Sequence, residues 1–87
     1  MYLHLGQSVV VPHGDVVGIF DLDNTSSSKE TRLFLNRAEK EGRVISLSPD
    51  LPKSFVVCRH GREDSYVYLS QLSSATLKGR MESGSFE

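Results

Sequence analysis

The sequence is poor in the residues that cross-link small domains. It has one cysteine, Cys58, so no internal disulfide can form, and its three histidines (His4, His13 and His60) lack the spacing of zinc ligands. A chain of 87 residues buries only about 60–65% of its unfolded surface, so its stability is marginal without further support. With disulfides and metals set aside, we expect self-association to supply that support.

Long apolar runs are also missing. No stretch approaches the roughly 18 apolar residues of a membrane-spanning helix, and the first residues lack the basic and apolar regions of a signal peptide. We therefore expect a cytoplasmic protein without a membrane partner. The composition, 38% hydrophobic and 24% charged, is that of a globular protein. We predict a single domain over residues 1–81 and a flexible, Gly/Ser-rich tail over residues 82–87.

An excess of one charge is lacking as well, because the net charge is −1. This balance excludes a general electrostatic attraction to nucleic acid. The distribution is uneven, however: residues 1–24 carry three acidic and no basic side chains, whereas residues 52–80 carry five basic and two acidic ones. The five basic side chains are those of Lys53, Arg59, Arg62, Lys78 and Arg80. They form either a basic face or ordinary solvated surface.

The apolar segments predict several short strands separated by turns. The expected strands are residues 2–5, 9–11, 16–22, 44–47, 54–58 and 65–70. The first three are closely spaced, which favours antiparallel pairing, and the nearly continuous apolar run at 16–22 is typical of a central, buried strand. Residues 44–47 are expected at a sheet edge. Residues 61–64 are the expected turn of a hairpin, in whose second strand Tyr66 and Tyr68 share one face.

Two helices are expected between and after these strands. Ser27 and Glu30 have the spacing of a capping box, which predicts a main helix from about Ser28 to Glu41 that ends at Gly42. Ser73 is the expected cap of a short C-terminal helix. The sequence therefore predicts a small α+β domain that is rich in antiparallel sheet.

One segment is similar to a catalytic motif. Val16 to Thr25 resembles the first motif of the haloacid-dehalogenase-like phosphatases, an apolar strand that ends in Asp-x-Asp-x-Thr, here with Asp21 and Asp23. Phosphoryl transfer also needs cations and further metal ligands, and the rest of the chain is too short for the doubly wound sheet that supplies them. We interpret Asp21, Asp23 and Asn24 as residues that shape a turn, and we expect no enzyme and no cofactor.

Other reactive side chains have simpler interpretations. Cys58 lies within a β-forming run and is expected to be a small buried apolar residue. His60, at the end of the hairpin strand, is expected to be solvated. Tyr66 and Tyr68 could stack on nucleobases, but a half-exposed strand face or a subunit interface is the simpler reading.

Three separated segments carry a resemblance to a known family. They are Met1 to Gly6, Asp15 to Asp21, and Pro52-Lys53-Ser54-Phe55-Val56-Val57 leading to Tyr68 through Lys78. In this order and spacing they resemble the RemA/RemB-like family of extracellular matrix regulatory proteins of Gram-positive, spore-forming bacteria. The resemblance covers residues 1 to about 81 and is carried by the ordered set of segments.

The resemblance implies a small cytoplasmic regulator of biofilm-matrix genes. RemA-type members resemble DNA-binding transcriptional activators that assemble into closed rings, with grouped arginines that meet phosphates. A ring of this kind would let each chain bury apolar surface on its neighbours. It would also multiply a weak basic patch by the number of subunits.

The match is incomplete at the positions that the family uses for DNA. RemA-type chains place an arginine pair where this chain has Asp50 and Leu51, and only Lys53 keeps a basic position there. They also carry an arginine just before the Val-Val-apolar strand, where this chain has Asp15. Lysine meets a phosphate as a point charge, without the two-pronged geometry of arginine. The resemblance therefore leaves Lys53, Arg59, Arg62, Lys78 and Arg80 as the candidate DNA-binding residues.

Two functions follow from these observations. The first is a homo-oligomeric, ring-forming regulator that binds duplex DNA through the five basic residues. The second is a regulatory module that binds a protein, such as a RemA-like relative, and does not itself bind DNA. The acidic Asp50 at the position of the missing arginine pair favours the second.

Overall fold

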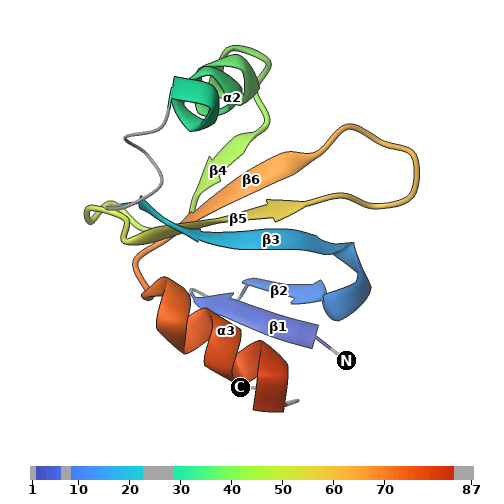
Figure 1. The fold of residues 1–87 in the computed structure, drawn as a ribbon, viewed down its shortest axis with the longest axis vertical. Helices are drawn as coiled ribbons and strands as arrows, with labels where there is room; N and C mark the ends of the chain where they lie inside the picture. Colours follow the sequence, from blue (N-terminus) through green and yellow to red (C-terminus); the bar gives the residue numbers. More distant parts are fainter. Residues whose placement is uncertain (1, 7–8, 23–28, 84–87) are drawn as a thin grey trace.

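The computed structural model describes residues 2–6, 9–22 and 29–83 (Figure 1). The elements in these residues are β1 (Tyr2–Gly6), β2 (Val9–Pro12), the 3₁₀ turn η1 (His13–Asp15), β3 (Val16–Asp21), α2 (Lys29–Lys40), β4 (Val44–Ser46), β5 (Ser54–Cys58), β6 (Tyr66–Ser70) and α3 (Ser74–Ser83). Antiparallel-rich sheets with one longer and one shorter helix confirm the predicted α+β class. None of the helices in this part of the chain is long and apolar enough to cross a membrane.

The strands form two sheets. One is the antiparallel pair β1–β2, and the other has the strand order β3-β5-β6-β4. Strands β5 and β6 form the expected antiparallel hairpin, in which Val56 lies opposite Tyr68. The expected strand at 44–47 is confirmed as the edge strand β4, but it runs parallel to β6, with Val44 opposite Val67. The long connection from β4 through β5 to β6 makes this parallel pairing possible.

The prediction of a central, buried strand at residues 16–22 was wrong. Strand β3 lies at the edge of the four-stranded sheet, and of its residues only Ile19 is buried. The register shifts between Val16 and Gly18, so Val17 is displaced from the ladder and is 65% exposed. Such bulges are common at sheet edges. The central strand is β5, in which every residue is buried.

The antiparallel pairing expected for the first three strands holds only for β1 and β2. Leu3 lies opposite Val11 in that pair. After Pro12 the η1 turn redirects the chain, and β3 pairs instead with β5, with Ile19 opposite Val56. Short sequence spacing favours a local hairpin, but it does not prevent a strand from joining a sheet formed later in the chain.

The four-stranded sheet is covered on both faces (Figure 1). The β1–β2 pair and α3 lie on one face, where Leu3, Leu5, Val56 and Leu77 are fully buried. Helix α2 lies on the other face, where the buried residues are Ala38, Phe55, Val57 and Val67. Adjacent residues of β5 therefore alternate between the two cores, as the two-residue period of a strand requires.

The face covered by α2 is the more thinly packed of the two. Ala38 is the only buried residue of that helix, and Leu33 on its outer side is 59% exposed. The helix spans Lys29–Lys40, close to the prediction, and Gly42 follows with φ of 73°, a conformation that favours glycine. The predicted cap Ser27 lies outside the described residues.

Helix α3 begins as expected at a serine cap. Ser73 Oγ accepts a hydrogen bond from the Thr76 N–H at 3.1 Å, which satisfies one of the free N–H groups at the helix start. The helix continues to Ser83, so it includes the first two residues of the segment that we predicted as a tail. Residues 84–87 lie outside the described part of the chain.

Candidate nucleic-acid interface

The first predicted DNA-binding residue, Lys53, lies at the end of the sheet where β5 begins. Its N–H donates to the Ser70 carbonyl at 2.8 Å, and its carbonyl accepts from the Leu22 N–H at 3.1 Å. Next to it, Ser54 Oγ donates to the Leu72 carbonyl at 2.7 Å. The backbone at Lys53 is therefore firmly held, while its side chain is exposed.

Arg59 and Arg62 lie at the opposite end of β5, in the β5–β6 loop. Five strand residues separate this loop from Lys53, which corresponds to about 20 Å at the usual rise of an extended chain. The loop is ordered by its own contacts: Arg59 Nε donates to the Glu63 carbonyl at 3.2 Å, and the Arg59 N–H donates to the Asp15 carbonyl at 2.8 Å. Glu63 and Asp64 in the same loop offset the charges of the two arginines.

A carboxylate also lies against this loop. His60 Nδ1 is 3.1 Å from Asp15 Oδ2 and 3.3 Å from Oδ1, so an imidazole protonated at Nδ1 donates a hydrogen bond to the carboxylate. The His60 side chain is 70% exposed, as predicted for a solvated histidine. Asp15 holds the position where the family resemblance leads us to expect an arginine. The hairpin loop is therefore electrostatically balanced and is not a basic patch.

The last two predicted residues lie on α3. Lys78 is exposed, whereas Arg80 is half-buried and its Nη1 donates to the His4 carbonyl at 3.1 Å. This hydrogen bond ties α3 to β1, so at least part of the Arg80 guanidinium has a structural role. The five predicted residues thus occupy three separate places on the chain. The structure does not bring them together into one cluster.

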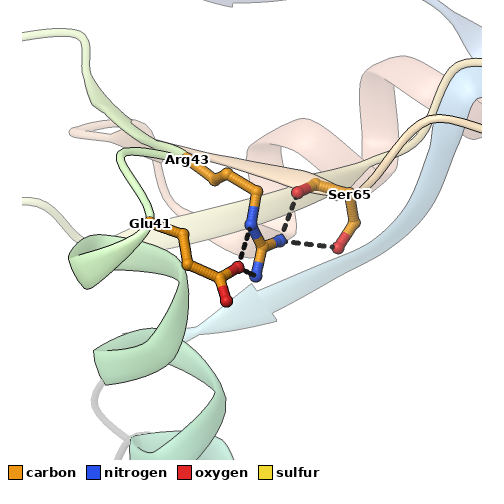
Figure 2. Close-up of polar contacts among 3 residues, drawn as sticks. All are labelled: Glu41, Arg43 and Ser65. Atoms are coloured by element: carbon orange, nitrogen blue, oxygen red, sulfur yellow. Dashed lines mark hydrogen bonds and ion pairs between the residues drawn. The ribbon is translucent and has the colours of Figure 1, made fainter.

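Sequence reasoning missed Arg43, a cation with contacts to two other residues in the described structure (Figure 2). Its Nε and Nη2 lie 2.8 and 2.6 Å from Glu41 Oε1, and its Nη1 donates to the Ser65 carbonyl and lies 3.2 Å from Ser65 Oγ. The side chain is 18% exposed. Arg43 therefore joins the end of α2 to the start of β6. No local signal indicates this role, because Ser65 is distant in the sequence.

The residues of the phosphatase-like motif do not form a metal site within the described part of the chain. The Asp21 carboxylate lies 3.5 Å from Ser74 Oγ at the start of α3, where a negative charge is favourable to the helix dipole. Asp23 lies outside the described residues. In the described ranges no three His, Cys, Asp or Glu side chains gather as metal ligands. The expectation that the chain is not an enzyme stays a prediction.

Cys58 and the two tyrosines have the expected surroundings. Cys58 is fully buried, and burial, with a smaller effect of the Asp15 charge, raises the pKa of its thiol to about 11. A protonated thiol is a poor nucleophile. Tyr66 and Tyr68 pack against the core on the α3 side, and their rings meet edge to face with centroids 5.4 Å apart. Burial raises the pKa of both hydroxyls.

Comparison with known proteins supports the resemblance seen in the sequence. The model of the RemA-like family, described as extracellular matrix regulatory protein A-like, matches residues 2–81. This chain belongs to the RemA-like family. It is also 38% identical over 82 residues to extracellular matrix regulatory protein B of Bacillus subtilis (strain 168), an alignment that covers 94% of this chain and 91% of the relative.

This RemA-like chain places its two departures from the expected arginine pattern at opposite ends of the sheet. Asp15 lies against the β5–β6 loop, and Asp50 and Leu51 lie in the loop before Lys53. Both Asp50 and Leu51 are exposed. The surface next to Lys53 therefore presents an acidic and an apolar side chain where the resemblance predicts two guanidinium groups.

Proposed function

We propose that this chain is a cytoplasmic regulator of extracellular-matrix genes that assembles into a homo-oligomer, with a ring as the expected form, and binds duplex DNA. The family membership supports the regulatory role. The observation that carries DNA binding is that four of the five predicted cations are exposed and that none of the four is in an ion pair among the described residues. These four are Lys53, Arg59, Arg62 and Lys78.

Self-assembly is essential to this proposal. One copy offers a few separated cations, and a single lysine–phosphate contact contributes little to affinity at physiological salt. A symmetric assembly repeats each cation at a fixed spacing, so several weak contacts act together and the apparent affinity rises without any new type of contact. A chain with a net charge of −1 can then hold DNA through cations that the assembly repeats.

Fluorescence anisotropy of a labelled duplex tests the proposal directly. We expect saturable binding at about 50 mM salt that weakens steeply at about 200 mM, because each neutralised phosphate releases counterions. Lys53→Ala and Lys78→Ala are expected to weaken binding and to reduce the salt dependence. Lys40→Ala, which removes an exposed lysine of α2 that is not one of the five predicted residues, is the matched control and is expected to bind as the wild type does.

Two results would count against DNA binding. One is a flat anisotropy at both salt concentrations. The other is an equal loss of affinity in the Lys53 and Lys40 variants, which would indicate attraction by overall charge instead of a defined surface. The proposal also assigns no reaction to the chain. Hydrolysis of p-nitrophenyl phosphate with Mg²⁺ that disappears in Asp21→Asn would contradict that part of it.

The second candidate function is a regulatory module that binds a protein without binding DNA. The exposed Asp50 and Leu51 favour it, since an apolar side chain next to a carboxylate suits a protein surface better than a phosphate backbone. Titration of a purified RemA-like protein with this chain, followed by calorimetry, tests this function. Binding that weakens in Asp50→Lys would support it, whereas no heat of binding to the RemA-like protein would oppose it.

A further inference from the structure

The loop between β4 and β5 holds a leucine out in the solvent. Leu51 is 90% exposed, more than any other large apolar side chain in the described residues. Pro49 and Pro52 flank the Asp50–Leu51 pair, and the proline ring fixes φ at both positions. The loop is thus stiff at the point where it carries its most exposed apolar group.

Hydrogen bonds hold this loop against the end of β6. Ser48 Oγ accepts from the Asp50 N–H at 3.2 Å and donates to Gln71 Oε1 at 3.0 Å. The Leu47 N–H donates to the Leu69 carbonyl at 3.1 Å. A loop that is already ordered loses little conformational entropy on binding, so its apolar side chain can act as an anchor. The loop therefore holds Leu51 in place before any partner binds.

A groove with mainly apolar walls lies between α2 and the β3–β5 edge of the sheet. Its volume is about 280 Å³, and it is lined by Val17, Phe20, Glu30, Thr31, Phe34, Phe55 and Val57. Small-molecule sites usually have about 300–1,000 Å³ and several convergent polar groups. The mainly apolar walls of this groove suit an apolar group as its occupant.

Strand β3 forms one wall of this groove with Phe20 and Val17. Phe20 stacks on Phe55 with ring centroids 5.0 Å apart, and the ring lies over Gly18, where a Cβ atom would approach it to 2.6 Å. The bulge turns Val17 outward at the rim, where it is 65% exposed. Covering apolar surface of this kind is favourable by roughly 25 cal/mol for each Å² removed from water.

We propose that Leu51 of one copy inserts into the α2–β3 groove of a second copy. This inference rests on the self-association in the proposed function and names the contact that produces it. The high exposure of Leu51 shows that the side chain does not fill the groove of its own chain. Because the inserted residue and the groove are different surfaces of one chain, the contact is head-to-tail. Such contacts close into rings when the rotation between copies allows it.

One pair of charges next to the two surfaces is complementary, whereas Glu30 in the groove has the same sign as Asp50. Asp50 precedes Leu51 in the loop, and Arg37 lies one turn beyond Phe34 on α2. A second hollow, of about 290 Å³, shares Phe34 and Glu30 with the groove and is also lined by Leu33 and Arg37. An inserted loop would bring its carboxylate toward this guanidinium. Such a pair fixes orientation more than it adds affinity, and a second copy supplies both partners of the contact.

Chemical cross-linking of two variants that each add one exposed cysteine to the native Cys58 tests the contact. Leu51→Cys and Val17→Cys are unfolded in urea, mixed, refolded together and treated with a short bismaleimide. We expect a cross-linked dimer in the mixture and none with either variant alone, because in a head-to-tail contact identical positions do not meet. Wild type measures the background from the buried Cys58. Val10→Cys, another exposed strand valine (52%), replaces Val17→Cys as the matched control and is expected to give no dimer.

Sedimentation velocity supplies an independent measure. Leu51→Ser and Val17→Ser are expected to weaken association about tenfold or more, as buried interface anchors do, whereas Val10→Ser and the conservative Leu51→Met leave it unchanged. A wild-type protein that sediments as a monomer would contradict the proposed self-association itself. An oligomer without the mixed cross-link would leave self-association intact and overturn this contact, assigning the groove to another occupant. A cross-link of Leu51→Cys with itself would overturn the head-to-tail arrangement.

Discussion

Arg43 and Lys53 carry the same charge in different surroundings. The Arg43 guanidinium meets Glu41 and Ser65 and is largely shielded from solvent. The Lys53 side chain is exposed, and no ion pair within the described residues includes it. The first cation therefore stabilises the fold, and the second has a charge that a ligand can use. At the residue scale, surroundings and not residue type separate the two roles.

Cys58 gives a prediction at the same scale. Its pKa is raised from 9.0 to about 11, so at pH 8 its thiolate fraction is roughly 100-fold lower in the folded chain than in the unfolded chain. We expect iodoacetamide at pH 8 to modify the native protein at least about 100-fold more slowly than the protein in urea, as followed by mass spectrometry. Equal rates would mean that β5 opens readily.

The raised pKa of Cys58 also predicts that the folded chain becomes less stable as the pH rises. The unfolded thiol ionises from about pH 9, while the folded thiol ionises only near pH 11. The contribution of the protonated Cys58 thiol to the free energy of unfolding is thus complete below pH 9, and it is lost as the pH rises from 9 to about 11. Urea unfolding across this range should show that the free energy of unfolding of Cys58→Ala does not have this fall, whereas that of the wild type does.

At the scale of the elements, α2 depends on few contacts with the sheet. Arg43 supplies one of them by joining the α2–β4 connection to Ser65 (Figure 2). We expect Arg43→Ala to lower the free energy of unfolding by about 1–3 kcal/mol, because it leaves a half-buried carbonyl without a donor. Urea unfolding measures this change. Arg32→Ala, which removes an exposed arginine of the same helix, should change stability by less than about 0.5 kcal/mol.

A comparison of Arg43→Ala with Glu41→Ala separates the two halves of this contact. Glu41 is 51% exposed, and exposed ion pairs contribute about 0–1 kcal/mol. A loss in Glu41→Ala as large as that in Arg43→Ala would therefore assign the effect to the ion pair and not to the hydrogen bonds with Ser65.

The elements also show what the sequence could and could not predict. The β5–β6 hairpin, the Ser73 cap and the C-terminal end of α2 before Gly42 follow from local patterns, and the structure confirms them. The edge position of β3 and the parallel partner of β4 depend on pairing between distant segments, which an apolar run does not encode. The same limit applies to the site: the five cations could be named from charge alone, but their separation could not.

At the scale of the whole molecule, two apolar surfaces of the described chain are left uncovered by its fold. One is the thinly covered α2–β3 groove, and the other is the loop that exposes Leu51. A small domain that leaves apolar surface of this kind in water gains stability when another copy covers it. Folding and assembly of this chain are therefore expected to be linked.

This linkage predicts an unfolding temperature that depends on protein concentration. A hundredfold increase in concentration should add about 1.4 kcal/mol per chain for a dimer and up to about 2.7 kcal/mol for a large ring. In a domain of this size, that corresponds to a rise of roughly 5–20 °C in the midpoint. Differential scanning calorimetry under reversible conditions measures it. Leu51→Ser should have a lower midpoint that varies less with concentration, because the substitution weakens assembly while leaving the fold of the single chain intact. A wild-type midpoint that stays constant over this range would show that the chain is stable without a neighbour, and the search for what covers Leu51 would then turn to a different protein.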